Sequence, residues 1–75
     1  MNDRRRKRLR HAMGTLEMAE IEVSSVIDEE TDSLENIPES LQDTDRYEKM
    51  EDTVDKLDDV IDTINDAIDK LREII

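Results

Sequence analysis

The chain has 75 residues and no cysteine, so it forms at most one small domain and contains neither disulfides nor thiolate metal sites. Charged residues make up 44% of it, and there is one glycine, one proline and one aromatic residue, a composition typical of long helices or of disorder. The formal net charge is −11, but residues 1–11 carry six basic groups and one acid, whereas residues 12–75 carry five and 21. This asymmetry predicts two surfaces with different partners.

The basic N-terminal arm, residues 1–11, is expected to be a helical extension of the first helix. Its positive charges oppose the helix dipole and repel one another, so something must offset them. The acidic body of the same or a neighbouring subunit, nucleic acid phosphates and another protein are the three alternatives. No aromatic residue is interleaved for base stacking, so sequence-specific reading is not expected. The cations of the arm are Arg4, Arg5, Arg6, Lys7, Arg8 and Arg10.

A first helix is expected at about residues 4–36. Its apolar positions alternate at intervals of four and three residues, the spacing of a coiled-coil seam, and two carboxylates interrupt them. Gly14 weakens this helix by about 1 kcal/mol relative to alanine but does not end it. The seam consists of Leu9, Met13, Leu16, Glu20, Val23, Ile27, Glu30, Leu34 and Ile37.

A turn is expected at residues 37–43. Pro38 disfavours the helical conformation of Ile37, and Asn36 is a tolerable helix terminus. Asp43 or Thr44 can serve as the N-cap of a following helix.

The second helix is expected at about residues 44–75, because its apolar residues follow an unbroken heptad pattern. With Tyr47 at heptad position a, every residue at positions b and f is acidic. These acidic rows are Glu48, Asp52, Asp55, Asp59, Asp62, Asp66, Asp69 and Glu73. The apolar seam is Tyr47, Met50, Val54, Leu57, Ile61, Ile64, Ile68, Leu71 and Ile75.

Two helices of matched length and a short connection predict an all-α fold, an antiparallel, coiled-coil-like hairpin that contains residues 12–75. Two registers are plausible. One sets Leu9 beside Ile75 and leaves Arg4–Arg8 overhanging, whereas the other slips by one heptad and sets Leu9 beside Ile68. We prefer the first register because it uses every apolar residue.

Further apolar residues lie at heptad position g, beside the seam of each helix. A stripe this wide fits more than two helices, so we expect a homodimer that forms a four-helix bundle. The expected dimer interface is Ala12, Ala19, Val26, Val60, Ala67 and Ile74.

The acidic rows have two interpretations. They can be a solvated face, assisted by lysines four residues away, such as Lys49 after Asp45 and Lys56 after Asp52. Alternatively, their charge repeats every ~10 Å along each row and imitates the field of a nucleic acid backbone, which would attract a basic partner.

No arrangement of residues predicts catalysis, a metal site or a cofactor. Residues 28–39 match several ligand offsets of a calcium loop, but Ser33 replaces the required glycine and Pro38 intrudes. No apolar run is long enough for a membrane span, and no apolar core follows the basic arm as in a signal peptide. We therefore expect a protein of the cytoplasm that has no membrane partner.

The turn sequence Asn36–Gln42, "NIPESLQ", and the flanking acidic helices resemble small helical proteins encoded by phages and prophages. In these proteins an Asn-x-Pro-Glu-x-Leu-Gln turn precedes an acidic helix with a repeated Ala/Val-Ile-Asp pattern. The resemblance implies an accessory protein of a mobile element that acts inside a bacterial host, a group in which inhibitors of host or defence proteins are frequent. It implies no activity and no binding residues.

Overall fold

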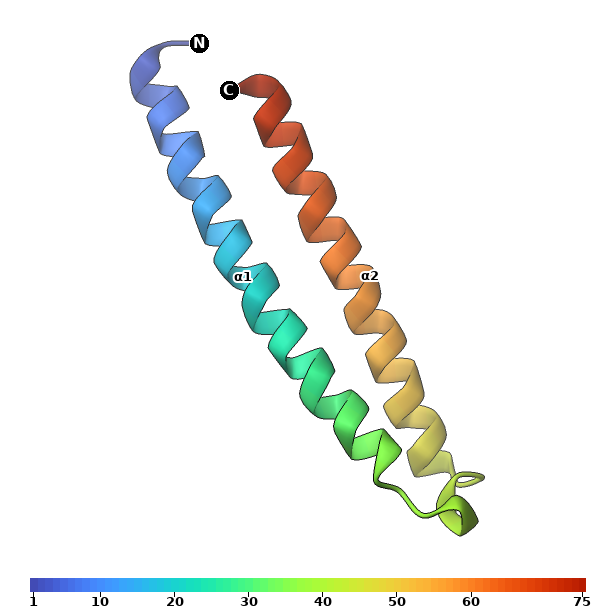
Figure 1. Ribbon diagram of the computed structural model, residues 1–75. Helices are drawn as coiled ribbons and strands as arrows, with labels where there is room; N and C mark the ends of the chain where they lie inside the picture. The colour runs from blue at the N-terminus through green and yellow to red at the C-terminus, as the bar shows by residue number, and fades with distance from the viewer.

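The computed structural model describes residues 1–75 as two long helices that run antiparallel, α1 (Asp3–Glu35) and α2 (Asp45–Ile74). A short 3-10 helix, η1 (Glu39–Leu41), lies in the turn between them (Figure 1). The molecule measures 60 × 15 × 12 Å and contains no strand. The prediction of an all-α fold made of two contacting helices is confirmed. The structure contains one chain, so the expected dimer stays a prediction.

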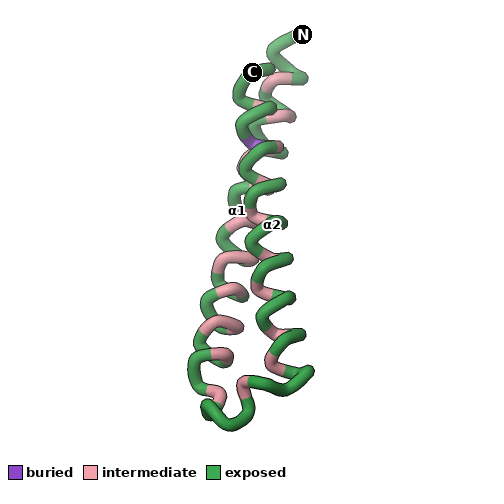
Figure 2. Tube along the Cα trace, turned by 90° about the vertical axis from the view of Figure 1, so that its right-hand side faces the viewer, coloured by how far each residue is buried: buried purple, intermediate pink, exposed green.

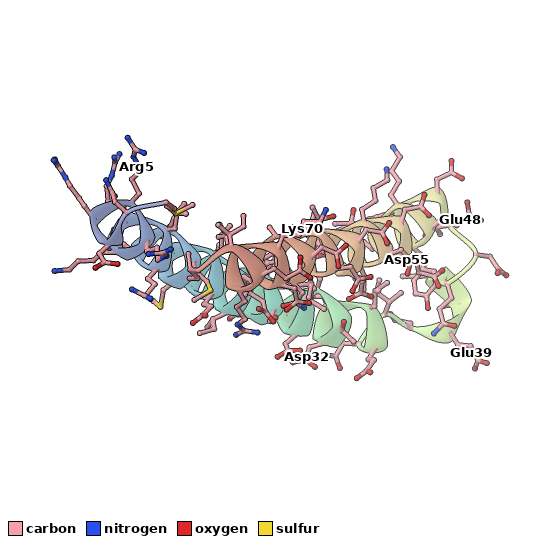
Figure 3. The ribbon with its side chains drawn as sticks, turned by 90° about the horizontal axis from the view of Figure 1, so that it is seen from above. Arg5, Asp32, Glu39, Glu48, Asp55 and Lys70 are labelled. Carbon is pink, nitrogen blue, oxygen red and sulfur yellow. The ribbon has the colours of Figure 1, made fainter.

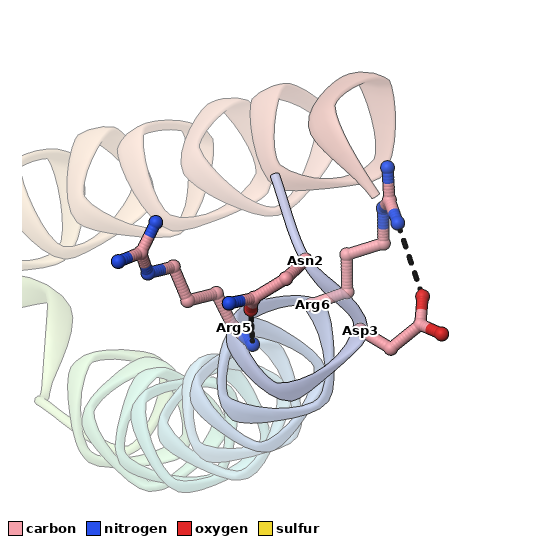
Figure 4. Close-up of polar contacts among 4 residues, drawn as sticks. All are labelled: Asn2, Asp3, Arg5 and Arg6. Atoms are coloured by element: carbon pink, nitrogen blue, oxygen red, sulfur yellow. Dashed lines mark hydrogen bonds and ion pairs between the residues drawn. The ribbon is translucent and has the colours of Figure 1, made fainter.

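α1 begins at Asp3, because the side chain of Asn2 caps its N-terminus. The backbone N–H of Arg5 donates a hydrogen bond to Oδ1 of Asn2 over 2.9 Å (Figure 4). Asp3 lies in the first turn, where its charge interacts favourably with the helix dipole. The basic arm is therefore part of a continuous helix, which sets the direction in which each of its side chains leaves the backbone.

The turn reverses the chain through local hydrogen bonds. Asn36 ends α1 with a backbone near the helical region, and Pro38 adopts an extended backbone with ψ of 143°. The backbone N–H of Leu41 donates to the carbonyl of Pro38 over 2.8 Å, and the side-chain amide of Gln42 donates to the carbonyl of Ile37 over 3.4 Å. The turn is thus a defined structure with its own bonds.

α2 begins after Thr44, one of the two N-cap residues that the sequence allows. The hydroxyl of Thr44 accepts a hydrogen bond from the backbone N–H of Tyr47 over 3.3 Å. The same hydroxyl donates to the carbonyl of Leu41 over 2.8 Å, so it links the end of η1 to the start of α2. Asp45 and Glu48 add negative charge to the first turn of the helix.

The apolar seam lies between the helices, as the heptad spacing predicts. Every seam residue expected on either helix is half-buried or buried, including the carboxylates Glu20 and Glu30 (Figure 2). Only Ile68 is fully buried, with 3% of its surface exposed. Two helices in contact shield one stripe of each helix and leave the rest in solvent.

An ion pair between the helices identifies the register of the hairpin. The guanidinium of Arg72 lies 3.9 Å from the carboxylate of Glu17. In the preferred register their backbones are offset along the helix axis by about five residues, roughly 7 Å, a distance that the two long side chains can span. The register slipped by one heptad would separate them by roughly 18 Å along the axis. The structure therefore has the register that sets Leu9 near Ile75.

Candidate interaction surfaces

The acidic rows of α2 form a continuous exposed surface. All eight carboxylates, Glu48 to Glu73 at heptad positions b and f, are exposed, and Asp55 and Glu48 are labelled among them in Figure 3. One of the eight, Asp69, has an ion-pair partner, Arg72, at 3.5 Å. The other seven carboxylates point into solvent without a basic partner within 4.0 Å.

The lysines of α2 do not neutralise this surface. Pairs between Asp45 and Lys49 or between Asp52 and Lys56 are compatible with helical spacing, yet neither pair forms an ion pair in the structure. Aspartate has a short side chain and lysine a long, mobile one, so an exposed pair gains little by ordering both. The lysines lie at heptad position c, beside the acidic rows, and the negative field of the rows is left largely uncompensated.

The basic arm lies at the end of the hairpin opposite the acidic turn, as the positions of Arg5, Glu39 and Glu48 show in Figure 3. All of its cations except Arg6 are exposed. Arg6 is half-buried and pairs with Asp3 at 3.1 Å (Figure 4). Four of the five residues Arg4–Arg8 are thus exposed, and Arg6 is paired within its own helix.

A surface hollow of about 600 Å³ lies beside the basic arm. Leu9, Ala12 and Met1 supply its apolar part, and Arg5 and Arg8 supply positive charge at its edge. Heptad spacing alone does not reveal this hollow, because Met1, one of its lining residues, precedes the helix. His11 completes the lining.

The expected dimer interface is an apolar strip along one side of the hairpin. In an antiparallel pair the g positions of both helices lie on the same side of the seam, so the two g rows form one strip. Val26, Val60 and Ile74 are 40%, 42% and 53% exposed, which is high for branched apolar side chains. Ala12 and Ala19 are exposed and Ala67 is half-buried. We call these six residues the apolar strip.

The opposite side of the hairpin is polar. The e positions, which include Glu17, Ser24 and Thr31 on α1 and Asp58, Asn65 and Arg72 on α2, lie there. Their one ion pair, Glu17 with Arg72, joins the two helices. The hairpin therefore has an apolar side and a polar side, and these are separate from the acidic rows.

Two further apolar side chains are exposed on the face of α1 that points away from α2. Met18 is 68% and Ile21 is 65% exposed, on the outer face of α1. A second, smaller hollow of about 280 Å³ lies at the turn, between Ser33, Ile37, Leu41 and Met50. Neither feature gathers catalytic side chains or a cluster of metal ligands.

Neither helix contains an apolar stretch long enough to cross a membrane. The chain matches no protein-family model, and no curated protein or solved structure is significantly similar to it. The features that bear on function are thus the exposed charges and the exposed apolar surface of the hairpin.

Proposed function

We propose that the protein is a non-enzymatic interaction protein whose acidic rows bind a basic surface on a partner protein and block it. One observation carries this proposal. Of eight exposed carboxylates on one face of α2, only Asp69 has an ion-pair partner. Like charges this close repel one another, and a basic partner would relieve that repulsion.

The spacing of the charges indicates what kind of partner fits. Glu48 and Glu73 are about 38 Å apart along α2, so eight carboxylates give roughly one charge per 5 Å. A strand of B-DNA carries about one phosphate per 3.4 Å. The acidic rows are therefore a rigid, somewhat weaker version of a nucleic acid strand, and a nucleic-acid-binding groove is the basic surface that they fit best.

The resemblance of the turn to proteins of phages and prophages suggests where this partner is found. An accessory protein of a mobile element acts in the cytoplasm of its bacterial host, and the partner would be a host or defence protein. Blocking a nucleic-acid-binding groove would inhibit such a protein without any chemistry by the inhibitor.

Affinity capture from a bacterial lysate tests the acidic rows. The first bait carries Asp55→Asn, Asp59→Asn and Asp62→Asn, and the control bait carries Asp28→Asn, Asp32→Asn and Glu35→Gln, which remove the same charge from α1. A partner retained by the wild type and the control but lost by the first bait supports the proposal. Equal loss with both baits would show that only net charge matters, and equal retention would show that the acidic rows are not the contact.

We also propose that two hairpins associate through the apolar strip into a four-helix bundle. The hairpin exposes 6017 Å², whereas a compact monomer of 8.8 kDa is expected to expose about 4,800 Å². Dimers of ordinary size bury about 800 Å² per subunit. The hairpin thus exposes more surface than a compact monomer would, and the branched apolar residues of the strip are exposed. Both features are expected of a chain that buries part of its surface in a dimer.

A second candidate function rests on the basic arm. Arg4, Arg5, Lys7, Arg8 and Arg10 are exposed and have no ion-pair partner. Cations on one end of a helix can bind phosphates of DNA or RNA without reading sequence, as expected of a structural or nucleic acid accessory protein. Salt-dependent DNA binding that disappears when residues 1–10 are deleted would favour this function over the first.

A further inference from the structure

We propose that the basic arm of each hairpin contacts the acidic turn-proximal half of α1 in a second copy, so that the two copies are antiparallel. This inference rests on the proposed dimer and adds its orientation and the role of the arm. It is argued from one arrangement of residues: the basic arm, the apolar strip and several carboxylates of α1 lie in adjacent heptad rows on the same side of the helix.

The arm continues the rows that border the strip. Because a heptad row repeats every seven residues, Arg5 lies in the row of Ala12, Ala19 and Val26. The neighbouring c row of α1 contains Arg8, Thr15, Glu22 and Glu29. Arg8 and Glu29 are both exposed. The side of α1 that carries the strip is therefore basic at one end and acidic at the other.

Symmetry restricts how two such faces can meet. With a twofold axis parallel to the helices, the two copies point the same way, and both basic arms gather at one end of the bundle. With a twofold axis perpendicular to the helices, α1 packs antiparallel on α1 of the second copy. The second arrangement sets the basic end of each α1 beside the acidic end of the other, whereas the first leaves both basic arms at the same end of the bundle.

The antiparallel arrangement also matches residue by residue along α1. If the axis passes Ala19, that residue meets its own counterpart and Ala12 meets Val26 of the second copy. Arg8 lies eleven residues before Ala19 and Glu29 lies ten residues after it, so Arg8 faces Glu29 of the second copy, and the reverse pair forms by symmetry. The small side chain of Ala19 at the centre allows close approach of the two helices.

The hollow beside the arm has the lining that this contact needs. Leu9 and Ala12 form its apolar part and Arg5 and Arg8 its charged edge. In the antiparallel dimer, Val26 of the second copy lies against Ala12, and Glu29 of the second copy lies against Arg8. An apolar side chain and a carboxylate one turn apart thus enter a hollow with apolar and cationic parts.

Disulfide trapping tests the orientation, because the chain has no cysteine of its own. We expect Ala19→Cys to form a covalent dimer under mild oxidation, since the two sulfurs meet at the axis. Ser25→Cys, exposed on the outer face of α1, is the matched control and should stay unlinked. In the parallel bundle Ala19 of the two copies lies on diagonally opposite helices, so an unlinked Ala19→Cys dimer would overturn the proposal.

A charge exchange tests the contact itself. Arg8→Glu and Glu29→Arg should each weaken the dimer roughly tenfold in sedimentation equilibrium, because each creates two like-charge contacts per dimer. The double variant should recover most of the affinity. Weakening by Glu29→Arg alone, with no recovery in the double variant, would contradict the pairing even if both variants fold.

The outcomes separate this inference from the proposals on which it rests. A monomeric wild type at all concentrations would refute the dimer and its orientation but leave the acidic rows untouched. A dimer that shows neither trapping at Ala19 nor recovery in the charge exchange would refute the orientation alone. Loss of partner capture by the α2 acidic variant is measured independently of both.

Discussion

At the scale of single residues, Thr44 makes the most consequential polar contacts of the turn. Its hydroxyl accepts from the N–H of Tyr47 and donates to the carbonyl of Leu41. Thr44→Ala removes both bonds, and we expect it to lower the free energy of unfolding by about 1 kcal/mol, measured by urea denaturation. Thr53→Ala is the control, because the hydroxyl of Thr53 bonds only to the carbonyl of Lys49 in its own helix. Equal destabilisation by both changes would contradict the capping role.

Gly14 is a weak point of α1 that nothing in the structure requires. A Cβ atom built on it meets no atom within 4 Å, and its φ angle is in the ordinary negative range. Gly14→Ala should therefore raise the free energy of unfolding by about 0.5–1 kcal/mol, seen as a higher urea midpoint at the same chain concentration. A lower midpoint would mean that a partner surface approaches the backbone at this position.

The sequence predicts some of these residue-scale features and not others. It limits the N-cap of α2 to Asp43 or Thr44, because few side chains accept backbone N–H groups, and the structure selects Thr44. It allows ion pairs such as Asp52 with Lys56 that do not form. Spacing on a helix makes an exposed pair possible, but the side-chain entropy of lysine decides whether it is populated.

At the scale of the helices, the contact between α1 and α2 depends most on Ile68. It is the one residue that the two helices bury fully, with 3% exposed, whereas Ile21 is 65% exposed. Ile68→Ala should cost roughly 2–4 kcal/mol of unfolding free energy, and Ile21→Ala should cost little, when thermal and urea unfolding are followed by circular dichroism. Similar losses for both variants would place the core elsewhere.

Glu20 and Glu30 occupy seam positions where apolar residues would pack better. Both are half-buried, and neither has an ion-pair partner. Replacing both by leucine should raise the free energy of unfolding by about 1 kcal/mol or more, because polar seam residues cost stability. Sedimentation should also show larger assemblies in this variant, because the two carboxylates restrict how the stripes align. An unchanged stability would show that water already satisfies both positions.

The helices themselves follow from the sequence, because an apolar spacing of three and four residues fits only a helix that packs on a neighbour. The register does not follow from the same pattern, because a slip of seven residues restores every seam position. The ion pair between Arg72 and Glu17 distinguishes the two alternatives. The heptad pattern does not predict the hollow at the basic arm, because one of its lining residues, Met1, precedes the heptads.

At the scale of the whole molecule, charge is separated along a rod 60 Å long, with the basic arm at one end and the acidic turn at the other. The acidic rows, the apolar strip and the basic arm are three surfaces that lie on different parts of the molecule. Each surface follows heptad rows and so requires a continuous helix. The apolar strip, which combines residues of α1 and α2, also requires that the two helices fold back on one another. The sequence predicts the residues of these surfaces, but their relative positions require the antiparallel arrangement of α1 and α2.

Folding back at Pro38 is thus the claim on which the apolar strip and the relative positions of all three surfaces depend, and small-angle X-ray scattering of the purified chain tests it most directly. The hairpin has a Cα radius of gyration of 17.4 Å. For two hairpins packed side by side we expect about 18–20 Å, given helix axes 8–10 Å apart. A single uninterrupted helix of the same chain would give about 32 Å, and an unfolded chain about 27 Å. A measured value below about 21 Å supports the hairpin, and a value near either of the larger two would contradict it.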